Sequence, residues 1–130
     1  ESYIEKTLES FLIQETDFPF EILIYDDAST DKTAKIISEY EAKYPKLIKP
    51  IYQTINKYSQ GIKTNPVFNW FRAKGEYSAL CEGDDYWFSA EKLQVQIELM
   101  KRYSDINLSF HPSYISDKDS NSSKVFTLLP

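Results

Sequence analysis

Two short apolar segments, each followed at once by acidic residues, restrict the folds open to this chain most strongly. Residues 20–25 read FEILIY and lead into DDASTD, and residues 77–82 read YSALCE and lead into GDD. A short, largely apolar run that ends in a polar loop is typical of a buried strand in a parallel sheet. The chain is therefore predicted to place acidic side chains at the ends of buried strands.

Helical and strand patterns alternate along the whole chain, without an internal repeat. Helices are predicted near residues 1–15, 31–43, 65–74 and 90–103, and strands near 20–25, 47–53, 77–82 and 106–115. This order is typical of an α/β fold with a mainly parallel sheet flanked by helices. Pro50 has no backbone N–H to donate, so the strand at 47–53 is predicted at an edge or a bulge.

The length of the chain fits one compact domain. It has 130 residues, of which 42% are hydrophobic and 15% aromatic, enough for one core and too few for two ordinary domains. We therefore predict a single domain over residues 1–130. The polar stretch at 116–124 is predicted as a mobile loop, and VFTLLP after it as the beginning of another strand.

Charge, cysteine count and hydropathy argue against several classes of protein. The net charge of −5 disfavours a nucleic-acid binder, which needs many Lys and Arg contacts to phosphates. A single cysteine, Cys81, excludes an internal disulfide framework and a Cys-rich zinc site, and fits a reducing compartment. No apolar run approaches the roughly 20 residues of a membrane span, and residues 1–15 lack a signal-peptide pattern. We therefore predict a cytoplasmic protein.

Both acidic groups are predicted at the carboxyl ends of strands, where open α/β sheets bind their ligands. Asp26 and Asp27 follow one strand, and Glu82, Asp84 and Asp85 lie at the end of the other. Charged groups near an apolar interior are costly unless they meet a cation, hydrogen-bond donors or water. A hard divalent cation, held by one or two carboxylates and completed by substrate phosphates, would stabilise the second group.

Each of these residues also has a purely structural interpretation. Ser29 and Asp31 precede a predicted helix, where such side chains commonly cap free N–H groups. The acidic segment at 82–85 could be a solvated turn before the next helix, because acidic turns are frequent. Elsewhere we expect core anchors at Tyr86 and Trp87, a buried strand residue at Cys81, and a structural or minor pocket residue at His111.

Three segments carry a resemblance to a known family: EILIYDDASTDKT at 21–33, AKGEYSALCEGDDYW at 73–87 and KLQVQIELM at 92–100. With them the chain resembles the inverting, nucleotide-sugar-dependent glycosyltransferases of the GT-A fold, glycosyltransferase family 2. This family includes many bacterial enzymes of surface polysaccharide synthesis, and the resemblance covers nearly the whole chain. It implies a Rossmann-like nucleotide-sugar-binding domain. It also implies transfer of a sugar, with inversion, from a nucleotide-diphosphate donor, UDP above all, to a glycan or lipid-linked acceptor.

The resemblance implies that several side chains bind the nucleotide part of the donor. Asp27 would accept a hydrogen bond from the base, usually uracil, with Asp26 beside it. Ser29 and Asp31 would shape the same loop. Lys63 stands in the loop where relatives often carry a basic residue, and it would contact the diphosphate.

The resemblance also implies a metal site at the EGDD turn. Asp85, the final acid, would ligate a manganese or magnesium ion that bridges the diphosphate. Asp84 would be a second metal residue and would also contact the sugar or ribose. Glu82 stands where the family commonly has an aspartate, so the resemblance implies no definite role for it.

Two expectations concern parts of the family fold outside this chain. The family's first strand, which lies inside the sheet, would precede Glu1, and the general base would lie beyond residue 130. The domain is thus expected to lack its first strand and to be incomplete at both ends. A second copy in a homodimer, or a rearrangement, is expected to cover the unpaired strand edge. The parent enzyme is expected in the cytoplasm or, as a peripheral protein, at the inner face of the membrane.

Three other functions are open from the residues alone. The chain could bind a nucleotide sugar, or serve as an interaction module, without catalysis. A magnesium-dependent phosphatase of the haloacid dehalogenase type would need an aspartate two residues after Asp26, where the chain has Ala28. A thiolate at Cys81 paired with His111 is disfavoured, because the neighbouring acids would raise the pKa of the thiol.

Overall fold

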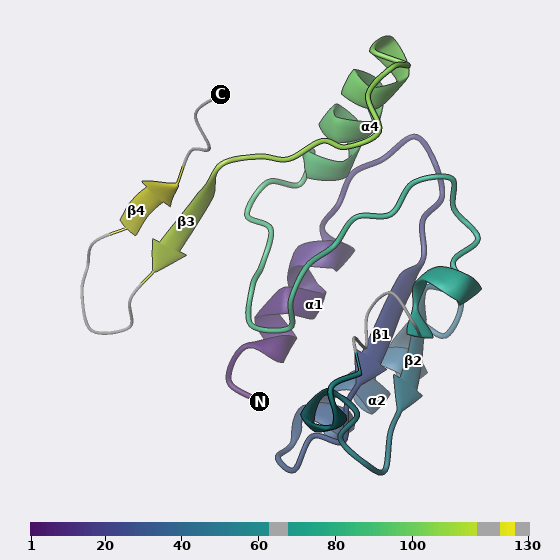
Figure 1. Ribbon diagram of the computed structural model, residues 1–130, viewed down its shortest axis with the longest axis vertical. Coiled ribbons are helices and arrows are strands. Elements are labelled where there is room, and N and C mark those ends of the chain that lie inside the picture. The colour runs from purple at the N-terminus through teal and green to yellow at the C-terminus, as the bar shows by residue number, and fades with distance from the viewer. Residues whose placement is uncertain (63–67, 117–122, 127–130) are drawn as a thin grey trace. The chain divides into compact units, whose positions relative to one another are not determined.

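The computed structural model describes residues 1–62, 68–116 and 123–126, which fall into two compact units. The first unit spans Glu1–Val95 and the second spans Gln96–Pro130. Figure 1 shows the helices and strands of both units along the chain. A single domain over the whole chain stays a prediction, because the division into two compact units does not show whether either unit folds by itself.

The first unit is built on two parallel strands joined by a helix. β1 (Ile22–Asp26) pairs with β2 (Ile48–Tyr52), with Ile22 opposite Ile48 and Asp26 opposite Tyr52. α2 (Thr33–Lys43) forms the connection between them. This βαβ arrangement confirms the predicted α/β class, with a parallel sheet flanked by helices.

Pro50 occupies a position in β2 that needs no N–H donor. Ile22 N–H donates to Leu47 O at 2.8 Å, and Gln53 N–H donates to Asp26 O at 2.9 Å. Because backbone groups of successive strand residues point to alternate sides, odd-numbered residues of β2 face β1 and Pro50 faces away. The prediction that Pro50 marks an edge strand is confirmed.

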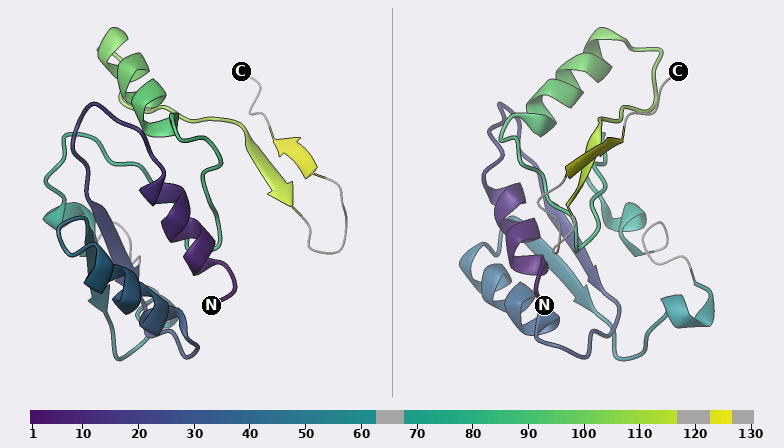
Figure 2. Two further views of the ribbon diagram at one scale, coloured as in Figure 1. Left: turned by 180° about the vertical axis from the view of Figure 1, so that it is seen from behind. Right: turned by 90° about the vertical axis from the view of Figure 1, so that its left-hand side faces the viewer.

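The core of the first unit lies between the sheet and two helices. α1 (Ile4–Leu12) and α2 lie on one side of the sheet, as two further views show (Figure 2). Leu8, Ile37 and Ile48 are at most 1% exposed, and they come from α1, α2 and β2. Full burial of each such side chain contributes about 1.5–3 kcal/mol, so the two helices are held on the sheet mainly by apolar contact.

The prediction of a strand at residues 77–82 is wrong, since this segment has no strand pairing. A strand requires hydrogen bonds to a neighbouring strand. Carbonyls of β1 accept hydrogen bonds from the side chains of Arg72 and Asn69 and not from residues 77–82. Arg72, at the end of the 3-10 helix η2 (Trp70–Arg72), donates from Nη2 to Ile24 O at 3.0 Å. Asn69 donates from Nδ2 to Leu23 O at 3.4 Å.

The second unit contains most of α4 (Lys92–Arg102) and an antiparallel pair, β3 (Ser113–Ser116) with β4 (Ser123–Phe126). The predicted helix is confirmed, and Ser89 Oγ accepts from Glu91 N–H at 3.3 Å just before it begins. The strand predicted at 106–115 is confined to the residues after Pro112. Of the loop predicted at 116–124, Ser116, Ser123 and Lys124 are strand residues of the antiparallel pair, and residues 117–122 lie outside the described residues.

None of the helices among the described residues has the length and hydropathy of a transmembrane span.

The apolar contact of α1 with the sheet predicts a large loss of stability on truncation of Leu8. Leu8→Ala should lower the free energy of unfolding by about 2–5 kcal/mol, because it removes a fully buried side chain and leaves a cavity. Urea unfolding followed by circular dichroism measures this change. Ile13→Ala, at a residue 51% exposed, is the control. Equal losses in both variants would contradict the placement of the core.

Candidate functional site

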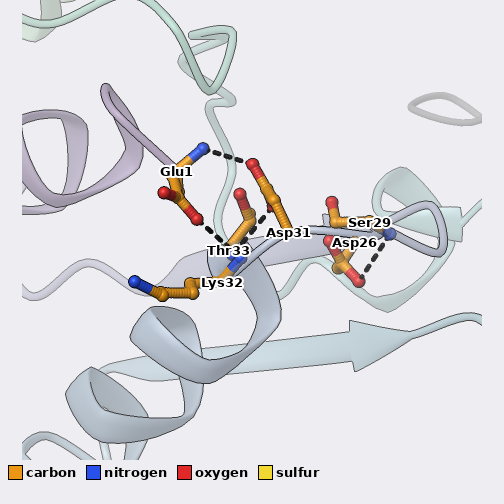
Figure 3. A network of polar contacts seen from close by, with 6 residues as sticks. All are labelled: Glu1, Asp26, Ser29, Asp31, Lys32 and Thr33. Atoms are coloured by element: carbon orange, nitrogen blue, oxygen red, sulfur yellow. Dashed lines mark hydrogen bonds and ion pairs between the residues drawn. The ribbon is translucent and has the colours of Figure 1, made fainter.

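The loop after β1 is shaped by Asp26. This residue is buried, and its Oδ2 accepts a hydrogen bond from Ser29 N–H at 3.4 Å (Figure 3). Between them Ala28 has a φ of 60°, a left-handed conformation that costs a residue with a Cβ about 1–2 kcal/mol. The contact of Asp26 holds the chain in this tight turn, and leaves Ser29 exposed at the surface.

Asp31 joins the start of α2 to the start of the chain. Its Oδ1 accepts from Thr33 N–H at 2.9 Å, and its Oδ2 accepts from the α-ammonium of Glu1 at 2.6 Å (Figure 3). The ammonium group and the hydrogen bond from Thr33 hold the pKa of Asp31 well below its usual range. Lys32 N–H also donates to the Glu1 side chain at 3.0 Å. The interpretation of Asp31 as a helix cap agrees with this geometry.

The Asp27 carboxylate holds a second loop in place. Its Oδ1 accepts from Lys57 N–H at 2.7 Å and its Oδ2 from Tyr58 N–H at 2.8 Å, at the start of the 3-10 helix η1 (Tyr58–Gln60). Tyr25 Oη donates to Oδ1 at 3.2 Å. Desolvation alone would raise the pKa of Asp27, but these hydrogen bonds outweigh it and the pKa is lowered. Each carboxylate oxygen has two lone pairs, so Oδ2 can still accept one more donor.

The backbone of the acidic turn, residues 82–85, is held by the side chain of Thr7 in α1. Thr7 is 2% exposed, and its Oγ1 lies 2.6 Å from Asp85 O and 3.0 Å from Gly83 O. Asp85 N–H donates to Glu82 O at 3.2 Å and closes the turn. A Cβ on Gly83 would lie 3.6 Å from Ile4 Cδ1, so the turn is close to the first turn of α1.

The carboxylates of the acidic turn belong to exposed residues. Glu82, Asp84 and Asp85 are exposed, and their side chains have no hydrogen bond or ion pair with any described residue. Among residues 1–62, 68–116 and 123–126, no three His, Cys, Asp or Glu side chains form a group ready to hold a metal. The turn therefore offers exposed carboxylate oxygens on a fixed backbone rather than a closed cage.

The aromatic residues after the turn add ring contacts with α1 to the hydrogen bonds of Thr7. Trp87 is half-buried and packs on Phe11, with ring centroids 4.6 Å apart. Lys92 Nζ lies 4.1 Å from the centroid of the Trp87 ring, and Lys6 Nζ lies 3.6 Å from that of Tyr86. The contacts of Trp87 agree with its predicted role as an anchor. Tyr86 is 42% exposed, so it is a surface aromatic under a lysine rather than a core residue.

Gln14, just after α1, holds the segment that leads into α4. Its Nε2 donates to Ser89 O at 2.7 Å, and its Oε1 accepts from Leu93 N–H at 3.1 Å. The backbone N–H of Glu15 donates to Ala90 O at 2.8 Å. Residues 83–93 are thus held by hydrogen bonds to Thr7 in α1 and to Gln14 and Glu15 just after it.

The sequence reasoning missed these polar anchors. Thr7, Ser10 and Gln14 are all buried, and they are spaced three and four residues apart, as residues on one helical face are. Polar residues at such spacing next to apolar Leu8 and Phe11 were the signal that could have found them. Lys63, predicted at the diphosphate, lies outside the described residues.

Cys81 is half-buried and not part of a strand, so its predicted place in a buried strand is wrong. Burial raises the pKa of its thiol to about 11, and the charges of Asp85, Asp84 and Glu82 add to the effect. His111 is exposed, with Nδ1 3.0 Å from the neighbouring Pro112 O. A raised thiol pKa disfavours the thiolate, so these contacts give no support to a Cys81 nucleophile.

The environment of Cys81 predicts slow alkylation. A pKa near 11 instead of the ordinary 9.0 lowers the thiolate fraction at pH 8 roughly 100-fold, so iodoacetamide should react correspondingly slowly in metal-free buffer. The rate should rise with pH up to that pKa. Asp85→Asn removes a nearby charge and should speed the reaction, whereas Asp17→Asn, an exposed acid outside the turn, should not. A free-cysteine rate in the unmodified chain would contradict this environment.

Comparison with known proteins identifies the family. The glycosyl transferase family 2 model matches residues 1–126. An uncharacterized protein of Mycobacterium bovis is 42% identical over 99% of this chain and 36% of its own length. The putative teichuronic acid biosynthesis glycosyltransferase TuaG of Bacillus subtilis is 36% identical over 78% of this chain and 38% of its own length.

A poly(ribitol-phosphate) beta-glucosyltransferase of Bacillus spizizenii is 34% identical over 68% of this chain and 14% of its own length. The chain thus spans well under half the length of these relatives. No solved structure matches it. The acidic loop after β1 and the EGDD turn held on α1 lie within the matched residues, and the chain belongs to glycosyl transferase family 2.

Proposed function

We propose that this chain forms the donor-binding part of an enzyme that transfers a sugar from a nucleotide-diphosphate sugar to a glycan or lipid-linked acceptor, with inversion. The observation that carries the proposal is the acidic turn. Its backbone is fixed by Thr7, while the carboxylates of Glu82, Asp84 and Asp85 stay exposed and unengaged among the described residues. Membership of glycosyl transferase family 2 supports this interpretation.

The loop after β1 is proposed to receive the nucleotide. Asp27 would accept a hydrogen bond from the base with the capacity that Oδ2 retains. Asp26 and Ser29 would keep the loop in shape through their own hydrogen bond. Lys63 is proposed to contact the diphosphate.

The acidic turn is proposed to hold Mn²⁺ or Mg²⁺ through Asp85, with Asp84 beside it. Such ions are bound by one or two carboxylates and substrate phosphates, so exposed oxygens without a closed protein cage fit this donor set. When bound, the ion would stabilise the negative charge that develops on the departing diphosphate. Thr7 and the hydrogen bond from Asp85 N–H to Glu82 O would keep the carboxylates in place for it.

The acceptor is proposed to be a cell-surface polymer or its lipid-linked precursor. The names of three matched relatives refer to teichuronic acid biosynthesis, to poly(ribitol-phosphate) glucosylation and to dTDP-rhamnosyl transfer. The last name carries a thymine nucleotide, so the base is proposed to be a pyrimidine, with uracil as the first candidate. A peripheral position at the inner face of the membrane would give access to lipid-linked acceptors.

Calorimetric titration with UDP, with and without Mn²⁺, tests the donor site. We expect binding that depends on Mn²⁺, and a loss of at least about tenfold in affinity, or 1.4 kcal/mol, in Asp85→Asn. dTDP should compete for the same site. Asp17→Asn, the same change at an exposed aspartate outside the turn, should bind as the unmodified chain does.

Circular dichroism shows whether each variant is folded. A folded chain that binds no UDP in the presence of Mn²⁺ would contradict the proposed donor site. Metal-dependent binding without sugar transfer in the full-length parent would instead favour a nucleotide-sugar-binding module without catalysis.

A further inference from the structure

We propose that Thr7 is a positioning residue for the acidic turn, which sets the affinity of the turn for a metal-bound nucleotide diphosphate; this inference rests on the proposed function. Thr7 belongs to α1, more than 70 residues before the turn in sequence, and its side chain is buried. It has no charge and would not touch the ligand. Its effect on the affinity would come only from the position in which it holds the backbone of the turn.

The hydroxyl of Thr7 donates to the turn in preference to its own helix. A helical threonine commonly donates to the carbonyl four residues earlier, and here Tyr3 O lies 3.2 Å from Oγ1. The two turn carbonyls are closer, at 2.6 Å for Asp85 O and 3.0 Å for Gly83 O. Since the hydroxyl has one proton, the shortest distance indicates that Asp85 O receives it.

The two carbonyls stand on either side of Asp84. The hydrogen bond to Asp85 O fixes the backbone from which the Asp85 side chain projects, and Gly83 O, on the other side of Asp84, lies 3.0 Å from the same hydroxyl. The carboxylates themselves have no partner among the described residues that could hold them. Thr7 is therefore the described side chain whose hydroxyl orders the backbone beneath the proposed metal ligands.

Other contacts would keep the fold intact without this hydroxyl. Gln14 holds Ser89 and Leu93, and Trp87 packs on Phe11. Loss of the hydroxyl should therefore loosen the turn locally. Residues that orient metal ligands commonly change metal affinity 10–100-fold when they are replaced, and we expect a loss near the lower end because the ligands are exposed.

Three variants separate positioning from general stability. Thr7→Val keeps the shape and removes the hydroxyl, and Thr7→Ser keeps the hydroxyl. Ser10→Ala is the matched control, because Ser10 is also buried on the same helix and its Oγ donates to Thr7 O at 2.7 Å rather than to the turn. Each variant is assayed by calorimetry with UDP over a range of Mn²⁺ concentrations, and by amide hydrogen exchange of residues 83–86.

We expect Thr7→Val to need roughly tenfold more Mn²⁺ for half-maximal UDP binding and to exchange faster at residues 83–86. Thr7→Ser should restore both, and Ser10→Ala should change neither.

The inference is overturned if the unmodified chain binds UDP with Mn²⁺ and Thr7→Val binds equally well, or if Ser10→Ala causes the same loss. Absence of metal-dependent binding in the unmodified chain would overturn the proposed function and this inference together. Unchanged exchange at residues 83–86 would overturn the inference alone.

Discussion

The need of buried polar side chains for hydrogen-bond partners determines where the acidic turn lies. Thr7 and Gln14 are almost fully buried, and a buried hydroxyl or amide without a partner costs about 1–3 kcal/mol. Their partners are backbone groups of residues 83–93. The same helix places Leu8 in the core. The hydrogen bonds that satisfy the buried polar side chains of Thr7 and Gln14 therefore also place the acidic turn and the segment after it beside α1.

The sheet shows the same requirement for hydrogen-bond partners in its backbone. In β2, Pro50 falls where no donor is needed, so the strand pairs fully with β1 despite the proline. At β1, side chains of Asn69 and Arg72 donate to carbonyls. Burial lowers the pKa of Arg72, with the charge of Glu21 opposing this. An Arg guanidinium stays charged even so, and a charged donor makes a strong hydrogen bond to a carbonyl.

The hydrogen-bond partners of the buried side chains and of the strands explain how far the sequence predicts the fold and the site. The βαβ unit at 20–53 follows from local patterns, because a buried strand, an amphipathic helix and an edge proline each have their own sequence signal. The strand predicted at 77–82 fails, because apolar composition cannot say whether a neighbouring strand is present. The acidic residues could be recognised as a group, and helical spacing could mark Thr7 as a buried polar residue. Its partner could not be predicted, since that partner is a turn far away in sequence.

The two acidic segments have different electrostatic states, and this difference limits their chemistry. The pKa of Asp31 is lowered by the α-ammonium of Glu1 and the hydrogen bond from Thr33, and that of Asp27 is lowered by backbone N–H groups that outweigh desolvation. A carboxylate with a lowered pKa is a poor general base near neutral pH, so these acids suit structure and hydrogen bonding to a ligand. Glu82, Asp84 and Asp85 instead place three like charges within four residues, without a described partner. The divalent cation proposed above would relieve their mutual repulsion, so the turn would gain more from a metal than the loop after β1 would.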